Sequence, residues 1–583
     1  MFLNYKILFF IFLIIFSKNV FSDEIQNNYF YKGLLKFNKQ KNIEILLSSE
    51  DVKKYKNIFA LQKEGNWKDS KRIIESLDNK ILLGHVKYQK LMHPTKYRSP
   101  YNELKDWLDL YSDHPMADRI WKLAKLRQPG GVKPPRLPQN IERISGYGLD
   151  RNTNIALKRF KISKKYYKYY SQVRNLVKRG RPTSALKQLN TYENLPQNIY
   201  DDLRGIISAG YYSVGKDKVS LKLAISSASR SGLNNPILYW RAALAAYRLD
   251  KKDISLKNFI ILTKIKEKHW LKSAAAYWAA KIFKEMNNEI DSTKFLKIAV
   301  EQLDTFYGQL ALESLEIDQQ FDWSIKNPGK IFTLDIFNNA HLKRAIALSA
   351  TERYGEADQE IRMLYGVLSE SNLEKLLEVT EYLNLPAVQM RLGDKLSQRG
   401  KNNYMALYPS PNWIAKENLK IDEAFLWALV RKESSFYLKA KSNRGARGLM
   451  QLMPRTARMV AKDRSLRGAN RWKLYDLHKN TTIGQKLILR LLKLENISNS
   501  LIPLLIAWNA GPNRLEQWNK KIKKYKDPLL YIESIPSYET RWFVKKVLKN
   551  LWIYRDKYEQ IKYSRKALSL NDWPKYINLN YTE

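Results

Sequence analysis

Apolar residues recur at intervals of three and four along most of this chain, which is the spacing of helices with one buried face. The pattern runs from about residue 23 to 399. Its short breaks carry Gly, Asn, Asp or Pro, as in RGRPTSALKQL and RSGLNNPILYW. Alternation of Val, Ile and Thr, which would indicate strands, is rare. The pattern therefore predicts an all-α protein.

Two segments with a Tyr-Trp opening indicate a repeat array in the N-terminal part. ILYWRAALAAYRLDKKDISLKNFIIL and AAYWAAKIFKEMNNEIDSTKFLKIAV each predict a helix with small alanines, a polar turn and a second helix. Trp240 and Trp278 lie 38 residues apart, a spacing that fits a TPR-like α-solenoid. We expect residues 23–400 to form an α-superhelical domain with both tryptophans in its core.

The helical pattern breaks at YMALYPSPNWIAKENLK. Pro409 and Pro411 force extended backbone at and before themselves, so we place a linker at 401–420. Residues 421–583 are predicted to form a compact helical domain. Its helices are expected at about 421–435, 454–462, 480–495, 501–510 and 537–558.

The first residues are typical of an export signal. Lys6 precedes an unbroken apolar run, Ile7 to Phe16, and Val20 and Ser22 stand at the two positions read by signal peptidase. We expect residues 1–22 to be a signal peptide cut after Ser22, which predicts a periplasmic protein. The alternative is an uncleaved anchor, but the run is short for a membrane-spanning helix, so stable membrane insertion is not expected.

The composition shows a strong positive charge and excludes several kinds of functional site. The formal net charge of +45 favours an anionic partner such as nucleic acid, a membrane face or an acidic polymer, with AT-rich coding drift as the alternative. Export argues against nucleic acid. The chain has no cysteine, which excludes disulfides and thiolate sites. The six histidines are scattered without i, i+4 spacing and no phosphate-binding loop appears, so neither a metal nor a cofactor is expected.

The candidate chemistry lies in ALVRKESSFYLKAKSNRGARGLMQLMP. Glu433 follows Leu429 by one helical turn, at the edge of an apolar face. A carboxyl group against apolar surface tends to keep its proton, which is what a general acid needs near neutral pH. The alternative for an isolated Glu is a surface ion pair with Arg431 or Lys432. The next acidic residue is Asp463, so no partner carboxylate is close in sequence.

ESSF, GARGLMQLMP, AWNAGPNR and ESIPSYETRWFVKKVL occur in the order and approximate spacing of motifs in the soluble lytic murein transglycosylases, which the chain resembles. The resemblance implies a ring-shaped superhelical domain and a lysozyme-like domain at 421–583. It implies cleavage of the β-1,4 bond between N-acetylmuramic acid and N-acetylglucosamine in peptidoglycan glycan strands, without cofactor or water. Glu433 matches the family's single acid/base, which would protonate the glycosidic oxygen and then deprotonate the muramic C6 hydroxyl to give a 1,6-anhydro end.

The resemblance also implies roles for other residues. It implies that Gln451 and Met453 line the glycan groove, that Asn509 shapes its wall, and that Glu539 contacts the sugar or peptide end. The remaining positions assigned to substrate binding are Ser434 and Ser435, expected to fix the turn after Glu433, together with Arg541 and Trp508. The cell-wall synthesis machinery is a further candidate partner.

The chain departs from the family pattern in two places. Trp508 stands where the family has tyrosine, and an indole can donate one hydrogen bond but accept none. Trp542 and Phe543 replace a small residue and a tyrosine. Two other functions therefore stay open: a muramidase that uses water, as goose-type lysozymes do, and a peptidoglycan-binding scaffold made inactive by Trp508. A nucleic-acid binder is motivated by charge alone.

Overall fold

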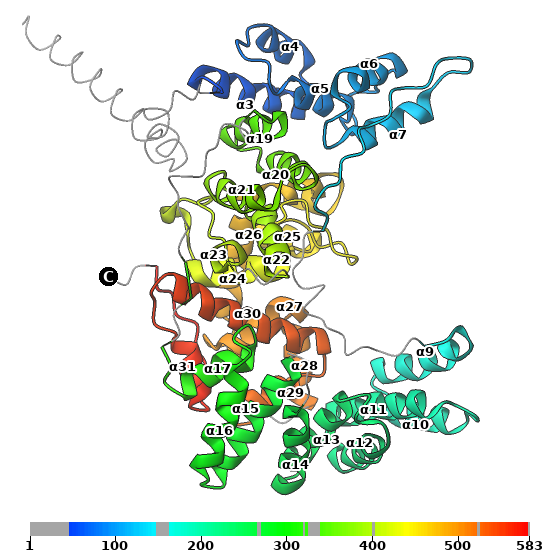
Figure 1. Cartoon of the computed structure of the whole chain (residues 1–583), viewed down its shortest axis with the longest axis vertical. Coiled ribbons are helices and arrows are strands. Elements are labelled where there is room, and N and C mark those ends of the chain that lie inside the picture. The colour runs from blue at the N-terminus through cyan, green and yellow to red at the C-terminus, as the bar shows by residue number, and fades with distance from the viewer. Residues whose placement is uncertain are drawn as a thin grey trace, which may run out of the picture. The chain divides into compact units, whose positions relative to one another are not determined.

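The computed structural model describes residues 46–146, 162–264, 270–318, 321–323, 338–398, 403–521 and 525–580. Within these ranges the chain is helical, with three isolated bridges and no strand (Figure 1), so the all-α prediction is confirmed. The predicted signal peptide and its cleavage at Ser22 lie outside the described residues. None of the described helices has the length and apolarity needed to cross a membrane.

The chain forms two compact units, and neither is continuous in sequence. Unit 1 comprises Met1–Gly148, Asp322–Ile414 and Ser435–Tyr437, and unit 2 comprises Leu149–Phe321, Ala415–Ser434 and Leu438–Glu583. The predicted limits of 23–400, 401–420 and 421–583 stay predictions, as does the closure of the helices into a ring.

Unit 1 combines N-terminal helices with helices from the middle of the chain. A shared apolar core joins Tyr55 and Ile58 to Leu342 and Leu376, which are all fully or almost fully buried. A second cluster forms around the buried Trp107. The helices are α3 (Ser49–Glu64), α4 (Trp67–Glu75), α5 (Leu83–Leu91), α6 (Tyr101–Tyr111), α7 (Ala117–Arg127), α19 (Ala340–Ala350), α20 (Tyr354–Met363), α21 (Glu370–Tyr382), α22 (Pro386–Ser397) and α23 (Tyr404–Leu407).

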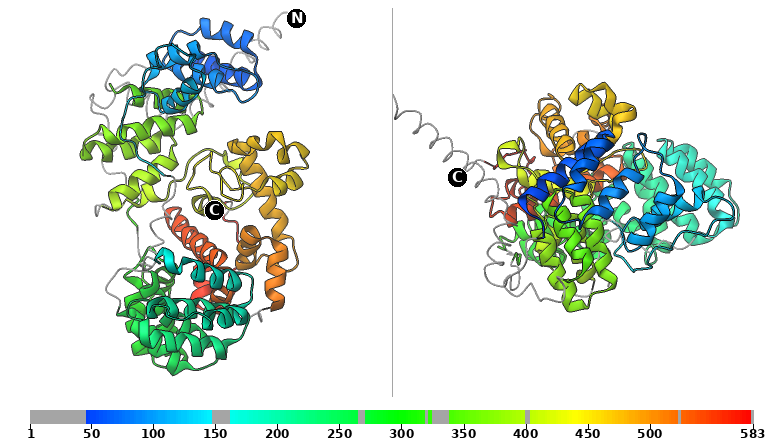
Figure 2. Two further views of the ribbon diagram at one scale, coloured as in Figure 1. Left: turned by 90° about the vertical axis from the view of Figure 1, so that its right-hand side faces the viewer. Right: turned by 90° about the horizontal axis from the view of Figure 1, so that it is seen from above.

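The first part of unit 2 is a stack of helices in which α11 to α16 each pack on the next (Figure 2). Trp240 lies 5.5 Å from Phe259 and Trp278 lies 5.0 Å from Tyr247, measured between ring centroids, and both tryptophans are buried. Their predicted place in the core is therefore confirmed. The helices are α9 (Lys164–Lys178), α10 (Pro182–Asn190), α11 (Gln197–Ser213), α12 (Asp217–Ser231), α13 (Ile237–Arg248), α14 (Lys252–Thr263), α15 (Trp270–Glu285), α16 (Glu289–Val300) and α17 (Phe306–Ser314).

The second part of unit 2 contains the five C-terminal helices that the periodicity predicts, with boundaries shifted by up to three residues. These are α24 (Glu423–Glu433), α25 (Pro454–Ala461), α26 (Leu477–Leu492), α27 (Leu501–Ala510) and α30 (Tyr538–Lys557). Three further helices, which the sequence reasoning missed, are α28 (Pro512–Lys521), α29 (Pro528–Ser534) and α31 (Tyr563–Ser569).

The long helix α30 organises this second part. It packs against α24, α27 and α17, and Trp552 on α30 stacks on Phe306 of α17 with ring centroids 5.1 Å apart. The buried Lys545 of α30 donates to Glu533 at 2.7 Å, and Tyr307 of α17 donates to the same carboxylate oxygen at 2.6 Å. These contacts fix the helix that supports the candidate site.

Candidate active site

Glu433 is the last residue of α24, and both ends of this helix are held in place. Asp422 caps the first turn by accepting the Phe425 N–H at 2.8 Å, and it also accepts the Leu579 N–H at 2.9 Å. Near the other end, Asn550 of α30 accepts a hydrogen bond from Arg431 at 3.0 Å. The position of Glu433 is thus set by contacts far away in sequence.

The carboxyl group of Glu433 meets one side chain. Trp508, near the end of α27, donates its indole N–H to Oε1 of Glu433 over 2.7 Å. Within the described residues Glu433 makes no ion pair and no other side-chain hydrogen bond, so a surface ion pair with Arg431 or Lys432 does not form. Glu433 is partly buried.

This environment changes the acidity of Glu433. Burial raises its pKa from the ordinary 4.5 to about 7, against the lowering effects of the Lys432 charge and the Trp508 hydrogen bond, and the charge of Glu539 also raises it. Desolvation dominates because only one donor reaches the carboxyl group. Glu433 is therefore partly protonated at neutral pH, which suits a group that must give up a proton and later take one back.

The end of α27 and the start of α30 form a wall beside this pair. Thr540 donates to Asn509 Oδ1 at 2.8 Å, which joins the two helices. Gly511 has φ of 92°, a conformation that favours glycine, and it lets the chain turn sharply into α28. Arg541 donates to the Ile535 carbonyl at 2.8 Å, and Glu539 is exposed in the first turn of α30.

A cavity of about 1000 Å³ adjoins this wall and also reaches α9, α11 and α13 of the helical stack. Asn509, Glu539 and Arg541 line it, together with the aromatic side chains of Trp518 and Tyr538. The acidic residues that line it are Glu539 and Asp202, and Asp202 accepts a hydrogen bond from Asn235 at 2.9 Å. Cationic residues outnumber them: Arg174, Lys178, Arg241, Arg444, Arg514 and Arg541.

The loop between α24 and α25 is held by a residue that the sequence reasoning missed. Asn480 of α26 is fully buried, donates to the carbonyl oxygens of Arg447 at 3.0 Å and Leu474 at 2.7 Å, and accepts the Met450 N–H at 2.8 Å. At Gly448 φ is 76°, and a Cβ there would lie 2.0 Å from the Leu474 oxygen, so only glycine fits. The sequence carries no local signal for this role of Asn480, because the asparagine lies 30 residues after the loop residue whose N–H it accepts.

The other predicted residues occupy this loop or its edges. Ser434 caps α24 at its C-terminus, and Ser435 follows with φ of 49°. The Gln451 side chain donates to the carbonyl oxygens of Ala440 at 3.1 Å and Gly448 at 2.9 Å, so its amide N–H groups tie the loop together. Met453 precedes α25 and is 41% exposed. The substrate-binding roles expected of these residues stay predictions.

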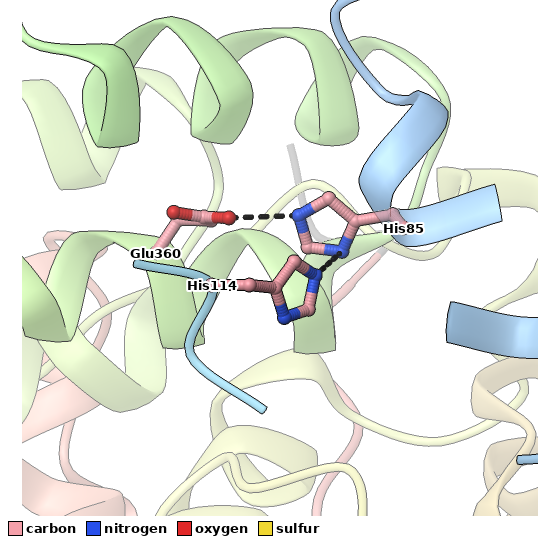
Figure 3. A group of neighbouring side chains, drawn as sticks. All are labelled: His85, His114 and Glu360. Atoms are coloured by element: carbon pink, nitrogen blue, oxygen red, sulfur yellow. Dashed lines mark hydrogen bonds and ion pairs between the residues drawn. The ribbon is translucent and has the colours of Figure 1, made fainter. Parts of the chain in front are cut away.

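Three histidines that are scattered in sequence meet in unit 1 around Glu360 of α20. Figure 3 shows His85 beside Glu360, with Nε2 and Oε1 2.8 Å apart, and His114 beside His85, with Nε2 and Nδ1 3.1 Å apart. His341 Nδ1 lies 2.6 Å from the second Glu360 oxygen. Spacing along one helix could not reveal this group, because its members come from four separate segments.

His85, His114 and Glu360 could in principle hold a metal ion, but the donors are already used. The Met116 N–H donates to His114 Nδ1 at 3.1 Å, so the His114 proton lies on Nε2 and points at His85. The His85 proton must then point at Glu360, which also accepts from Arg344 at 2.9 Å. A guanidinium charge on the carboxylate opposes a cation, so the geometry fits a closed hydrogen-bond network better than a metal centre.

Comparison with known proteins agrees with the sequence motifs. Residues 411–530 match the family model of the Transglycosylase SLT domain. The soluble lytic murein transglycosylase of Escherichia coli is 26% identical over 291 residues, which is 48% of this chain and 43% of that protein. A putative soluble lytic murein transglycosylase of Haemophilus influenzae is 32% identical over 162 residues, 28% of this chain and 26% of that protein. The aligned parts thus span less than half of either relative.

Two solved structures share the fold over nearly the whole chain. The 70 kDa soluble lytic transglycosylase of Escherichia coli has a TM-score of 0.53 at 18% identity, covering 92% of this chain and 100% of that one. An inactive mutant of lytic transglycosylase Slt from Pseudomonas aeruginosa has a TM-score of 0.54 at 17% identity, covering 97% of both chains. The resemblance to soluble lytic murein transglycosylases is confirmed, as is the fold of a superhelical and a lysozyme-like helical domain.

Proposed function

We propose that this protein is a lytic transglycosylase of peptidoglycan. It cleaves the β-1,4 bond between N-acetylmuramic acid and N-acetylglucosamine without water and leaves 1,6-anhydro ends. The observation that carries the proposal is Glu433, a lone carboxyl group whose pKa is raised by burial to about 7 and whose one side-chain partner in the described part of the chain is Trp508. The match of residues 411–530 to the SLT domain supports it.

Glu433 performs both proton transfers in this mechanism. Its protonated carboxyl group gives a proton to the glycosidic oxygen as the bond to C1 breaks, and the substrate's N-acetyl group stabilises the developing cation. The resulting carboxylate then removes the proton of the muramic C6 hydroxyl, whose oxygen attacks C1. Because the substrate supplies the nucleophile, a second protein carboxylate is not needed, in contrast to ordinary glycosidases.

The basic cavity gives the substrate's charged parts a place to bind. Stem peptides of peptidoglycan carry carboxylates, and six lining residues of the cavity are cationic while only Asp202 and Glu539 are acidic. Trp518 and Tyr538 add aromatic faces for sugar rings. We propose that Asn509, Glu539 and Arg541 position the strand here. The predicted export signal supports a periplasmic location, and the cell-wall synthesis machinery stays a predicted partner.

Product analysis tests the proposal. Purified protein is incubated with peptidoglycan sacculi, and the released muropeptides are identified by mass spectrometry. We expect 1,6-anhydro products, each lighter by one water than a reducing-end product. Glu433→Gln, which cannot donate or accept the proton, is expected to release none above background.

The muramidase is the second candidate, and the observation that favours it is Glu539. This carboxylate is close enough to raise the pKa of Glu433, and a second carboxylate could activate water. Reducing-end products that disappear in Glu539→Gln would establish the hydrolase. A protein that binds sacculi but releases no more than Glu433→Gln would be the inactive scaffold.

A further inference from the structure

The two oxygens of Glu433 have different surroundings. Oε1 accepts the indole N–H of Trp508 at 2.7 Å, whereas Oε2 accepts no hydrogen bond from the described residues. An indole has one donor and no acceptor. A protonated carboxyl group has a carbonyl oxygen, which accepts hydrogen bonds well, and a hydroxyl oxygen, which accepts poorly. The indole therefore favours the form in which Oε1 is the carbonyl oxygen.

We propose that Trp508 is a positioning residue that keeps the acidic proton of Glu433 on Oε2. This inference rests on the proposed function and adds a role specific to this chain. The tyrosine of the family pattern behaves differently, because a phenol can also accept a hydrogen bond. With a phenol, the proton could sit on Oε1 and point away from the substrate. The preference of the indole for one form is roughly fivefold, the effect of one neutral hydrogen bond.

The helices that carry the indole and the carboxyl group are anchored to a common neighbour. Trp508 follows four residues of α27 that are buried, Leu504, Leu505, Ile506 and Ala507. Its neighbour Asn509 is bonded to Thr540 of α30 at 2.8 Å. α30 in turn packs on α24, which carries Glu433. Donor and acceptor therefore belong to helices that pack on the same third helix.

The arrangement serves both half-reactions. In the first, the Oε2 proton moves to the glycosidic oxygen as the C1–oxygen bond breaks. In the second, Oε2 takes the C6 hydroxyl proton while the C6 oxygen bonds to C1. Oε1 keeps its hydrogen bond to the indole throughout, so the carboxyl group does not have to rotate between the steps.

Two substitutions separate this role from simple packing. Trp508→Phe keeps an aromatic ring but removes the N–H, and Trp508→Tyr offers a group that both donates and accepts. The direct readout is the infrared C=O stretch of protonated Glu433, isolated as the difference between each protein and its Glu433→Gln partner at low pH. The charged neighbours Lys432 and Glu539 are unchanged in all variants. Trp573→Phe is the matched control, because its indole donates to the Lys526 carbonyl at 3.0 Å instead of a carboxyl group.

We expect one C=O band in the wild type, shifted to low frequency by the indole. In Trp508→Phe the band moves to higher frequency, and kcat falls about twofold, because losing a fivefold preference leaves the two proton positions about equally populated. KM changes little, and the alkaline limb of the kcat profile moves to higher pH. In Trp508→Tyr the band splits in two, while the control matches the wild type. Trp508→Tyr decides the outcome if Trp508→Phe does not fold.

An unchanged band and kcat in Trp508→Phe, or a single wild-type band in Trp508→Tyr, would overturn the positioning role. Either result leaves the proposed function intact as long as the wild type releases anhydro products. Conversely, if the wild type releases no anhydro products, the proposed function is wrong, whatever the infrared C=O bands show. The two failures are thus distinguishable.

Discussion

Glu360 in unit 1 and Glu433 in unit 2 are both glutamates whose carboxyl groups are shielded from water, yet their pKa values are shifted in opposite directions. Burial alone would raise the pKa of Glu360, but hydrogen bonds from His341 and His85 and the charge of Arg344 outweigh it and hold the pKa well below the usual range. For Glu433 burial wins, and the pKa rises to about 7 although Lys432 and Trp508 oppose it.

The difference lies in how many donors reach the carboxyl group. Glu360 meets three side chains that offer N–H groups, one of them cationic, and it ionises fully inside the protein. Glu433 meets a single neutral N–H, which compensates only part of the lost hydration. The first arrangement suits a structural anchor, and the second suits a group that exchanges protons.

The largest expected effect is on catalysis. Glu433→Gln keeps the shape of the side chain and can still accept the indole N–H, but it cannot transfer a proton. We expect a loss of roughly a thousandfold in the release of anhydro muropeptides. The matched control is Glu423→Gln, because Glu423 on the same helix also accepts an indole N–H, from Trp427 at 3.0 Å. Comparable losses in both variants would show that the effect arises from folding.

The next largest effect is on the stability of unit 1. Glu360→Gln leaves Arg344 and His341 buried without their anion, so we expect a loss of about 4 kcal/mol and a lower melting temperature. Glu356→Gln on the same helix is the control, because its ion pair with Arg353 is partly exposed and contributes at most about 1 kcal/mol. Equal melting temperatures for the two variants would contradict the anchoring role of Glu360.

A third prediction uses the pH dependence of stability, where the two glutamates have opposite signs. The pKa of Glu433 is higher in the folded state, so its ionisation favours unfolding as pH rises from 4.5 to about 7, by about 3 kcal/mol. Glu433→Gln should therefore melt higher than the wild type at pH 8 and like it at pH 4. A lower melting temperature at pH 8 would contradict the raised pKa.

Glu360 changes the pH dependence of stability in the opposite direction to Glu433. Its folded-state pKa is depressed, so its stabilisation is present above the unfolded pKa and is lost as pH falls toward the depressed value. Burial beside His85 also lowers the pKa of His114 well below its usual value, which adds to the acid-side loss. We expect Glu360→Gln to reduce the steepness of acid unfolding, measured by circular dichroism below pH 5.

The smallest effect tests the charges beside Glu433. The Lys432 charge lowers the pKa of Glu433 and the Glu539 charge raises it. The alkaline limb of the kcat profile should therefore move to higher pH in Lys432→Met and to lower pH in Glu539→Gln. Shifts in the same direction for both variants would show that packing, and not charge, changes the acidity.

Local signals in the sequence were sufficient for part of this picture. Five of the C-terminal helices follow from apolar spacing, because that spacing sets which face of a helix is buried. The core positions of Trp240 and Trp278 follow from the repeat. Glu433 at the edge of an apolar face follows from its place one turn after Leu429. Helices α28, α29 and α31 were missed although α28 is as long as α27, because the polar α28 (PNRLEQWNKK) has few apolar residues and α29 (PLLYIES) is buried on all sides, so neither shows a clear apolar face.

The sequence by itself determined the helical fold, the motifs around Glu433 and the presence of an indole at position 508. Only the tertiary structure decided what each carboxyl group meets. His85, His114, His341 and Glu360 come from segments up to 275 residues apart, and Trp508 lies 75 residues after Glu433. Periodicity reports the neighbours along a helix, whereas a pKa depends on every donor and charge that folding brings near. That is why sequence could nominate Glu433 but could not say that Glu360 would be ionised.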